Sequence, residues 1–220
     1  MSGYFITFEG TEGSGKSTQI SLLAEHLRAM GHTVLTIREP GGTPIGEEIR
    51  HTLKHSNAND AMTAETELLL MNASRAQLVR EVIRPALERG EIVLSDRFYD
   101  STIAYQGFGR GLNLGVVRSI IDFAVGVTRP DLTLLLLVSR EISEERLLAR
   151  QATRPFMRDR IEEADRSFFE RVAKGYQTIA ASEPQRVRSV YASGTVEEIR
   201  QSIWKQIEPL FSRRRPMPVY

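Results

Sequence analysis

The sequence predicts an α/β domain built on a parallel β-sheet with helices on both faces. Short apolar runs rich in β-branched residues alternate with longer amphipathic stretches, which is the pattern of repeated βαβ units. A glycine-rich turn follows the first of these runs and leads directly into a helix-like stretch. With 220 residues, the chain is long enough for one such domain but short for two.

Five strands are expected, and all are apolar enough to be buried on both faces of a sheet. They are residues 4–8, 33–37, 92–94, 132–138 and 187–191. The first helix should open at Ser17 and end near Met30, because Gly31 can adopt the left-handed conformation that terminates a helix.

Two later helical stretches carry boundary signals. The stretch from about residue 63 to residue 89 contains Pro85, which should kink or interrupt it, and Gly90 should stop it. Thr195 and Glu198 form a capping box for the last helix. The domain is expected to span residues 1–212, and the arginine-rich segment 213–220 is expected to be a solvated tail.

Composition excludes several classes of function. The chain has no cysteine, so disulfides, a thiolate nucleophile and cysteine-type zinc sites are excluded. Its 29 basic and 28 acidic residues nearly cancel, which gives no general attraction to nucleic acid. No run of 18 apolar residues and no basic leader are present, so we expect a cytoplasmic protein without a membrane span.

The glycine-rich turn is a complete G-x-x-x-x-G-K-S phosphate-binding loop. Its glycines let successive backbone amides point inward, and the helix that follows adds the positive end of its dipole. Lys16 should reach the β and γ phosphates and take part in catalysis, and the Ser17 hydroxyl should hold Mg²⁺. The predicted ATP-binding residues are Gly10, Thr11, Glu12, Gly13, Ser14, Gly15, Lys16, Ser17 and Thr18. The loop predicts nucleotide binding but does not specify the reaction.

The third strand is followed by Ser95, Asp96 and Arg97, at the sheet edge where open α/β sheets bind their ligands. Asp96 is expected to orient Mg²⁺ or its water. Arg97 is expected to bind a phosphate with its two-pronged guanidinium and to take part in catalysis. The alternative is that Asp96 caps the next helix and that Arg97 forms a surface ion pair.

Further motifs accompany the loop along the chain. They are Glu39 to Thr43, Asp96-Arg97, Ser101-Thr102, Tyr105-Gln106-Gly107, Pro130-Asp131, Asp159-Arg160-Ile161-Glu162 and Phe168-Phe169. In order and spacing they resemble the bacterial thymidylate kinases, over about residues 3 to 195. The resemblance implies a P-loop kinase fold with a five-stranded parallel sheet and a short lid. It also implies ATP with Mg²⁺ as the donor, thymidine monophosphate (dTMP) as the acceptor, and a homodimer.

The resemblance implies an acceptor pocket opposite the loop. Its residues would be Glu12, Glu39, Pro40, Met71, Arg75, Arg97, Ser101, Thr102, Tyr105 and Gln106. Glu12 would lie near the 3′-hydroxyl, Arg75 and Thr102 at the thymine edge, Arg97 on the phosphate and Tyr105 beside the deoxyribose. The alternatives are that Tyr105 is an ordinary packing residue, that Arg75 lies on the surface and that Gln106 is solvated.

A lid is expected at about residues 150–160, where Arg150, Arg154, Arg158 and Arg160 surround Pro155. By resemblance, Arg154 or else Arg150 would be catalytic, supplying charge over the transferred phosphoryl group; a solvated basic helix face is the alternative. Three positions depart from the family pattern. Met71 occupies the position where the family usually has a phenylalanine that stacks on thymine, and Leu137 and Tyr191 occupy positions where it usually has acids.

The interpretation is therefore a dTMP kinase that transfers the γ-phosphoryl group of Mg-ATP to dTMP, giving dTDP and ADP. Four alternatives remain. Two are other kinases: a deoxynucleoside kinase with Glu39 as the base, and a kinase for another nucleoside monophosphate. The other two are a nucleotide-binding switch that hydrolyses slowly and a catalytically weakened member of the family. Leu68-Leu69-Leu70 could serve the dimer interface or the monomer core.

Overall fold

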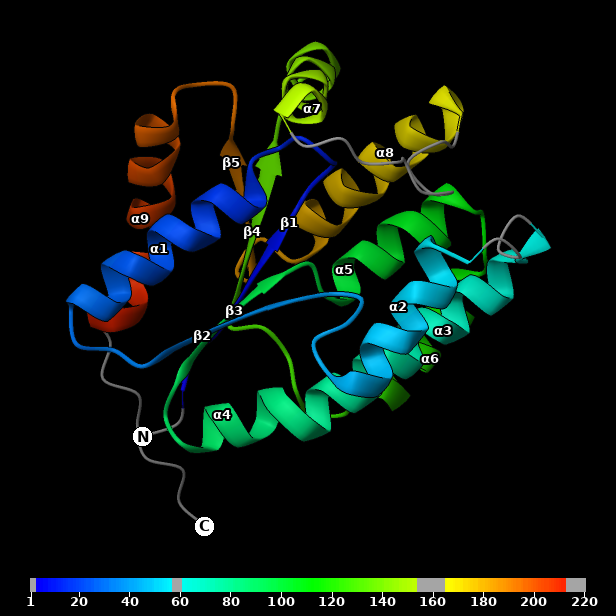
Figure 1. Cartoon of the computed structure of the whole chain (residues 1–220), viewed down its shortest axis with the longest axis horizontal. Helices are drawn as coiled ribbons and strands as arrows, with labels where there is room; N and C mark the ends of the chain where they lie inside the picture. The colour runs from blue at the N-terminus through cyan, green and yellow to red at the C-terminus, as the bar shows by residue number, and fades with distance from the viewer. Residues whose placement is uncertain (1–2, 57–60, 154–164, 213–220) are drawn as a thin grey trace.

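The computed structural model describes residues 3–56, 61–153 and 165–212. This part of the chain forms a five-stranded parallel sheet in the order β2-β3-β1-β4-β5 (Figure 1). The strands are β1 (Phe5–Glu9), β2 (Val34–Arg38), β3 (Ile92–Asp96), β4 (Leu132–Leu137) and β5 (Val187–Tyr191). All five predicted strands are confirmed, and the predicted α/β fold class with them.

The largest difference from prediction is at the end of β3. That strand was expected to stop at Leu94 but continues through Ser95 to Asp96, because both residues pair with β1 and β2. Their polar side chains hid the continuation, since a parallel strand buried on both faces is expected to be apolar throughout.

Helices cover both faces of the sheet (Figure 1). On one face α1 (Lys16–Ala29) and α9 (Val196–Ser212) pack over a core that includes Ile6, Phe8 and Leu94. On the other face lie α3 (Ala64–Leu78), α4 (Arg84–Glu88), α5 (Tyr99–Thr102), α6 (Leu114–Val125) and α8 (Arg166–Ser182). Beside these, α2 (Pro44–Lys54) packs against α3, and α7 (Arg140–Thr153) lies at the carboxyl ends of the strands.

The helix boundary signals act as predicted. Gly31 follows α1 with a φ of 89°. The stretch after α3 changes to a π-helical turn, Val79–Ile83, and Pro85 then occupies the first turn of α4, so the regular α-helix is interrupted just before the proline. At the start of α9, Thr195 N donates to Glu198 over 2.8 Å and Glu198 N donates back to Thr195 Oγ1 over 3.3 Å, which is the predicted capping box.

Strand order places the site. β1 lies in the middle of the sheet, between β3 and β4, and Phe8 is in register with Asp96. The loop after β1 and the residues after β3 therefore leave the sheet side by side, at the carboxyl edge where α/β folds bind ligands. Within the described residues, we find no helix with the length and apolar character needed to span a membrane.

Candidate active site

The phosphate loop joins β1 to α1 and holds the Lys16 side chain at its centre. The Lys16 ammonium donates to Thr11 O over 2.9 Å, to Gly10 O over 3.2 Å and to Ser14 Oγ over 3.4 Å. Burial, assisted by the nearby Arg97 guanidinium, lowers the pKa of Lys16. The predicted loop residues are thus brought together, with Thr18 exposed in the first turn of the helix.

Helix α7 also contacts the phosphate loop. Ser143 Oγ donates to Glu12 O over 2.6 Å. Gly13 has a φ of 70°, and a Cβ on it would come within 2.6 Å of Ser143 O. Only glycine fits there, because a side chain would meet backbone and strain its own φ.

Ser17 and Asp96 lie together as predicted. Ser17 Oγ donates to Asp96 Oδ2 over 2.7 Å, so the first turn of α1 and the end of β3 present a hydroxyl and a carboxylate to the same space. These hard oxygen ligands fit Mg²⁺, which commonly completes its shell with water and phosphate oxygens. No cluster of three or more His, Cys, Asp or Glu side chains suited to a metal occurs among the described residues. Asp96 is not a helix cap, contrary to the alternative, because Phe98 holds the N-cap position of α5.

Arg97 is the residue that connects the loop to the neighbouring cavity. It has a φ of 72°, in the left-handed region, and its side chain is only 14% exposed. Its Nη2 donates to Glu12 Oε1 over 2.7 Å and its Nη1 donates to Gly10 O over 3.0 Å. Burial alone would raise the pKa of Glu12, but the Arg97 and Lys16 charges outweigh it and hold that pKa well below its usual range.

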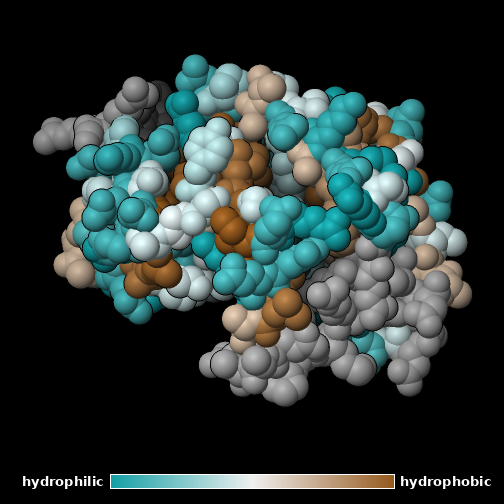
Figure 2. All heavy atoms as spheres, turned by 90° about the horizontal axis from the view of Figure 1, so that it is seen from above, coloured by the Kyte–Doolittle hydropathy of each residue, from teal (hydrophilic) through white to brown (hydrophobic). Residues whose placement is uncertain are grey.

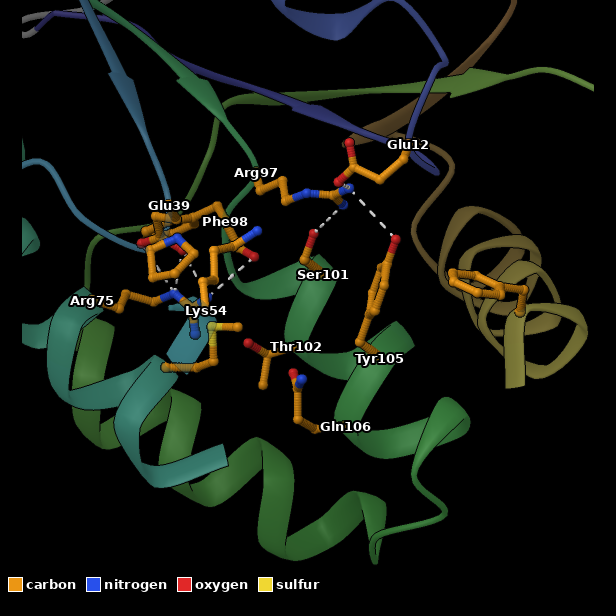
Figure 3. A pocket seen from close by; sticks show the side chains of 13 residues that line it. Glu12, Glu39, Lys54, Arg75, Arg97, Phe98, Ser101, Thr102, Tyr105 and Gln106 are labelled. Carbon is orange, nitrogen blue, oxygen red and sulfur yellow. Dashed lines mark hydrogen bonds and ion pairs between the residues drawn. The ribbon is translucent and has the colours of Figure 1, made fainter. Parts of the chain in front are cut away.

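The cavity lies beside Arg97 and encloses about 570 Å³, its open mouth included. Figure 2 looks down on this side of the molecule and shows hydrophobic atoms exposed among hydrophilic ones. The lining residues include every predicted acceptor-pocket residue: Glu12, Glu39, Pro40, Met71, Arg75, Arg97, Ser101, Thr102, Tyr105 and Gln106. Figure 3 shows Arg97, Glu12 and Tyr105 toward one end and Arg75, Thr102 and Gln106 toward the other.

Arg75 is fixed before any ligand is considered. Its Nη2 and Nε donate to Glu39 Oε2 over 2.7 and 2.9 Å, and its Nη1 donates to Asn72 Oδ1 over 2.9 Å. The alternatives that place Arg75 and Gln106 in solvent are wrong, because each is 2% exposed. Burial raises the pKa of Glu39 despite the opposing charge of Arg75.

Sequence reasoning missed Glu9 and Tyr176. The Glu9 carboxylate is fully buried and accepts from Phe98 N over 2.8 Å, from Ser101 Oγ over 2.6 Å and from Tyr176 Oη over 2.9 Å. Burial and the charge of Asp100 raise the pKa of Glu9 to about 7. A signal for Glu9 existed, since an acid ended an otherwise apolar strand; Tyr176 on a packed helix face gave none.

Three further cavity-lining residues, Lys54, Phe98 and Phe169, were not assigned to the pocket. The lid prediction falls mostly outside the described residues. Arg154 lies there, as do residues 155–160, and of Arg150 only the backbone, at the end of α7, is described. Residues 213–220 also lie outside.

Comparison with known proteins agrees with this geometry. A family model for thymidylate kinase matches residues 8–203. The chain belongs to the thymidylate kinase family. It is 47% identical over 215 residues to the thymidylate kinase of Pseudomonas fluorescens, covering 98% of this chain and 100% of that protein. It is 46% identical over 206 residues to that of Syntrophotalea carbinolica, covering 91% and 93%.

A solved structure supports the fold. The crystal structure of thymidylate kinase from Ehrlichia chaffeensis matches with a TM-score of 0.75 at 31% identity, covering 94% of this chain and 99% of that one. The family predicted from the motifs is therefore confirmed, together with the P-loop kinase fold.

Proposed function

We propose that this chain carries out the reaction of its family, phosphorylation of dTMP to dTDP, with Mg-ATP as the donor. Family membership supports the kinase activity and its acceptor. The observation that carries the residue-level proposal is the position of Arg97, which touches both the phosphate loop and the acceptor cavity. One cation thereby lies where a donor phosphate and an acceptor phosphate would meet.

On the donor side, the loop amides and Lys16 would bind the triphosphate of ATP. Ser17 and Asp96 are 2.7 Å apart and would hold Mg²⁺ between them and the phosphates. The metal would neutralise charge on the β and γ phosphates. Arg154, or Arg150, remains the proposed lid arginine over the transferred group.

On the acceptor side, the two ends of the cavity suit the two ends of a nucleotide. Arg97 would bind the phosphate, with Glu12 near the 3′-hydroxyl and Ser101 beside them. Arg75, Thr102, Met71 and Gln106 would surround the base, and Tyr105 would lie against the sugar.

No general base is required for this transfer. A phosphate monoester has a second pKa near 6, so its attacking oxygen is already an anion at neutral pH. The obstacle is repulsion between two polyanions, which positioned cations overcome. A deoxynucleoside kinase would need a carboxylate base, but both oxygens of Glu39 are already bound by Arg75. The structure therefore favours a phosphate acceptor over a hydroxyl acceptor.

The test is ADP release, measured by a coupled assay with Mg-ATP and each acceptor in turn: dTMP, dCMP, UMP, AMP and thymidine. We expect turnover with dTMP well above that with every other acceptor. Turnover highest with thymidine would replace the proposal by the deoxynucleoside kinase. No acceptor dependence, together with no binding of dTMP in the absence of ATP, would favour the nucleotide switch.

We also propose a cytoplasmic homodimer, with α6 and its neighbour α3 in the interface. Phe123 and Val127 are 84% and 89% exposed, and Val116 and Leu69 are each 56% exposed. Val116 and Phe123 share one face of α6, because they are seven residues apart. Of the three leucines considered for the interface, Leu68 is buried in the monomer core, Leu70 is half-buried and Leu69 is the one exposed to a partner. Sedimentation of Phe123→Lys as a monomer, with the wild type dimeric, would support this; a monomeric wild type would exclude it.

A further inference from the structure

A buried acid lies directly behind the base end of the cavity. Glu67, on α3, is 0% exposed, and its Oε1 accepts from Gln106 Nε2 over 2.7 Å. On its other side, Arg110 Nη2 donates to Glu67 Oε2 over 3.0 Å and Arg110 Nε donates to Oε1 over 3.3 Å. Glu67 itself does not line the cavity, whereas Gln106 does.

This contact determines which way the Gln106 amide faces. A carboxylate held by an arginine has only acceptors to offer, so the amide must turn its NH₂ group toward Glu67. The reverse orientation would lose a charge-assisted bond and would press two oxygens together inside the protein. The amide oxygen is then left on the side of the cavity, where Figure 3 shows the end of the Gln106 side chain beside Thr102.

The chemistry of the ligand that fits this oxygen follows. Gln106 and Thr102 lie away from Arg97 and Glu12, so a nucleotide with its phosphate on Arg97 would bring its base to them. An acceptor fixed at the base edge favours a ring N–H, as at N3 of thymine. It disfavours a ring nitrogen with a lone pair, as at N3 of cytosine, because two acceptors would then face each other without a proton.

We propose that Glu67 is a positioning residue for acceptor choice: by fixing the polarity of the Gln106 amide, it makes the site select pyrimidines with an N3–H over cytosine. This inference rests on the proposed acceptor, dTMP. Glu67 lies outside the cavity, yet it would set the preference of the cavity for thymine over cytosine.

The decisive variant is Glu67→Gln. The amide introduced at this position can donate or accept, so the Gln106 amide becomes free to turn its NH₂ group toward the ligand. We expect kcat/KM for dTMP to fall about tenfold and the ratio of kcat/KM for dTMP to that for dCMP to fall by at least about tenfold. A purely structural role for Glu67 would lower both activities together and leave the ratio unchanged, and that result would overturn the proposal.

The chain offers a matched control. Gln77 Nε2 donates to Glu81 over the same 2.7 Å, but this pair lies exposed and outside the cavity lining. Glu81→Gln should leave the ratio at its wild-type value. A similar fall in the ratio for Glu81→Gln would show that the effect is not specific to Glu67, and would count against the proposal.

A swapped pair keeps the proposal testable if Glu67→Gln folds poorly. In the double variant Glu67→Gln with Gln106→Glu, the NH₂ group belongs to residue 67 and the cavity again meets an acceptor. We expect the preference for dTMP over dCMP to return to within about threefold of wild type. A folded double variant without that preference would overturn the proposal. The wild-type assay with dTMP separates this failure from failure of the proposed function, which would appear as no dTMP turnover at all.

Discussion

Replacing Arg97 by alanine tests whether its guanidinium binds the acceptor phosphate. Arg97 Nη1 is engaged with Gly10 O and Ser101 Oγ, at 3.0 and 3.1 Å. Its Nη2 meets Glu12 Oε1 at 2.7 Å, on the cavity side. Nη2 is thus the arm that an acceptor phosphate would bind, sharing it with or displacing Glu12.

The expected size of the effect follows from these contacts. A hydrogen bond to a charged group contributes about 1.5–3 kcal/mol, so two bonds to a phosphate would contribute about 3–6 kcal/mol. Part is offset, because the bond to Glu12 must be weakened when dTMP binds. With about 3 kcal/mol as the net contribution, the Kd of dTMP should rise on the order of 100-fold in Arg97→Ala.

ATP should respond much less. Arg97 makes one ordinary bond to the loop backbone, at Gly10 O, and losing such a bond should change the Kd of ATP by less than about tenfold. Its other loop contact, with the Glu12 carboxylate, lies on the cavity side. Titration calorimetry with dTMP alone and with a non-hydrolysable ATP analogue alone gives both values. Equal losses for the two ligands would refute the assignment of Arg97 to the acceptor, and a melting temperature far below wild type would show that the variant reports on folding instead.

Three further perturbations follow from the site. Lys16→Ala should lower kcat by at least about 100-fold with an unchanged circular dichroism spectrum, because Lys16 donates its hydrogen bonds to oxygens of the loop itself; wild-type turnover would reject the loop assignment. Met71→Phe should lower the Kd of dTMP by about two- to tenfold if the ring stacks on the base, as measured by calorimetry. Glu9→Gln tests whether burial raises the pKa of Glu9 to about 7 from 4.5. If it does, the wild type should lose folding stability relative to this variant as the pH rises from 4.5 to about 7. The loss should total roughly 3 kcal/mol in urea unfolding and then level off; a difference independent of pH would contradict it.

The sequence predicted most of the fold because its signals are local. Glycines after β1 and α1, a capping box before α9 and a proline in the first turn of α4 each act within a few residues of their position. The end of β3 was mispredicted because Ser95 and Asp96 are polar. Their place in the sheet depends on partners in β1 and β2, which are distant in sequence.

The residues of the site were predictable to different degrees, as the elements of the fold were. The loop and the Asp96-Arg97 pair follow from spacing, and similarity to a family supplied the acceptor residues. The partners of those residues could not be predicted, because each pairing joins distant segments: Arg75 with Glu39, 36 residues apart, or Gln106 with Glu67, 39 apart. A buried charge predicts that some partner exists but does not identify it.

These partners share one arrangement, which explains why buried acids surround a site for a polyanion. Arg97, Arg75 and Gln106 line the cavity, and each donates to a carboxylate: Arg97 to Glu12, Arg75 to Glu39 and Gln106 to Glu67. Buried ion pairs contribute little net stability, since desolvation offsets much of their attraction. Their effect here is on orientation. Each of the three cavity side chains is fixed before the nucleotide binds, so the entropy of ordering that side chain is not lost again on binding. The acids also reduce the net positive charge of the cavity, so a bare phosphate gains less there than a nucleotide that bonds the two arginines and the Gln106 amide oxygen at once. Replacing any one of these acids by its amide should therefore weaken the preference for a complete nucleotide over a bare phosphate more than it weakens the folding stability of the protein.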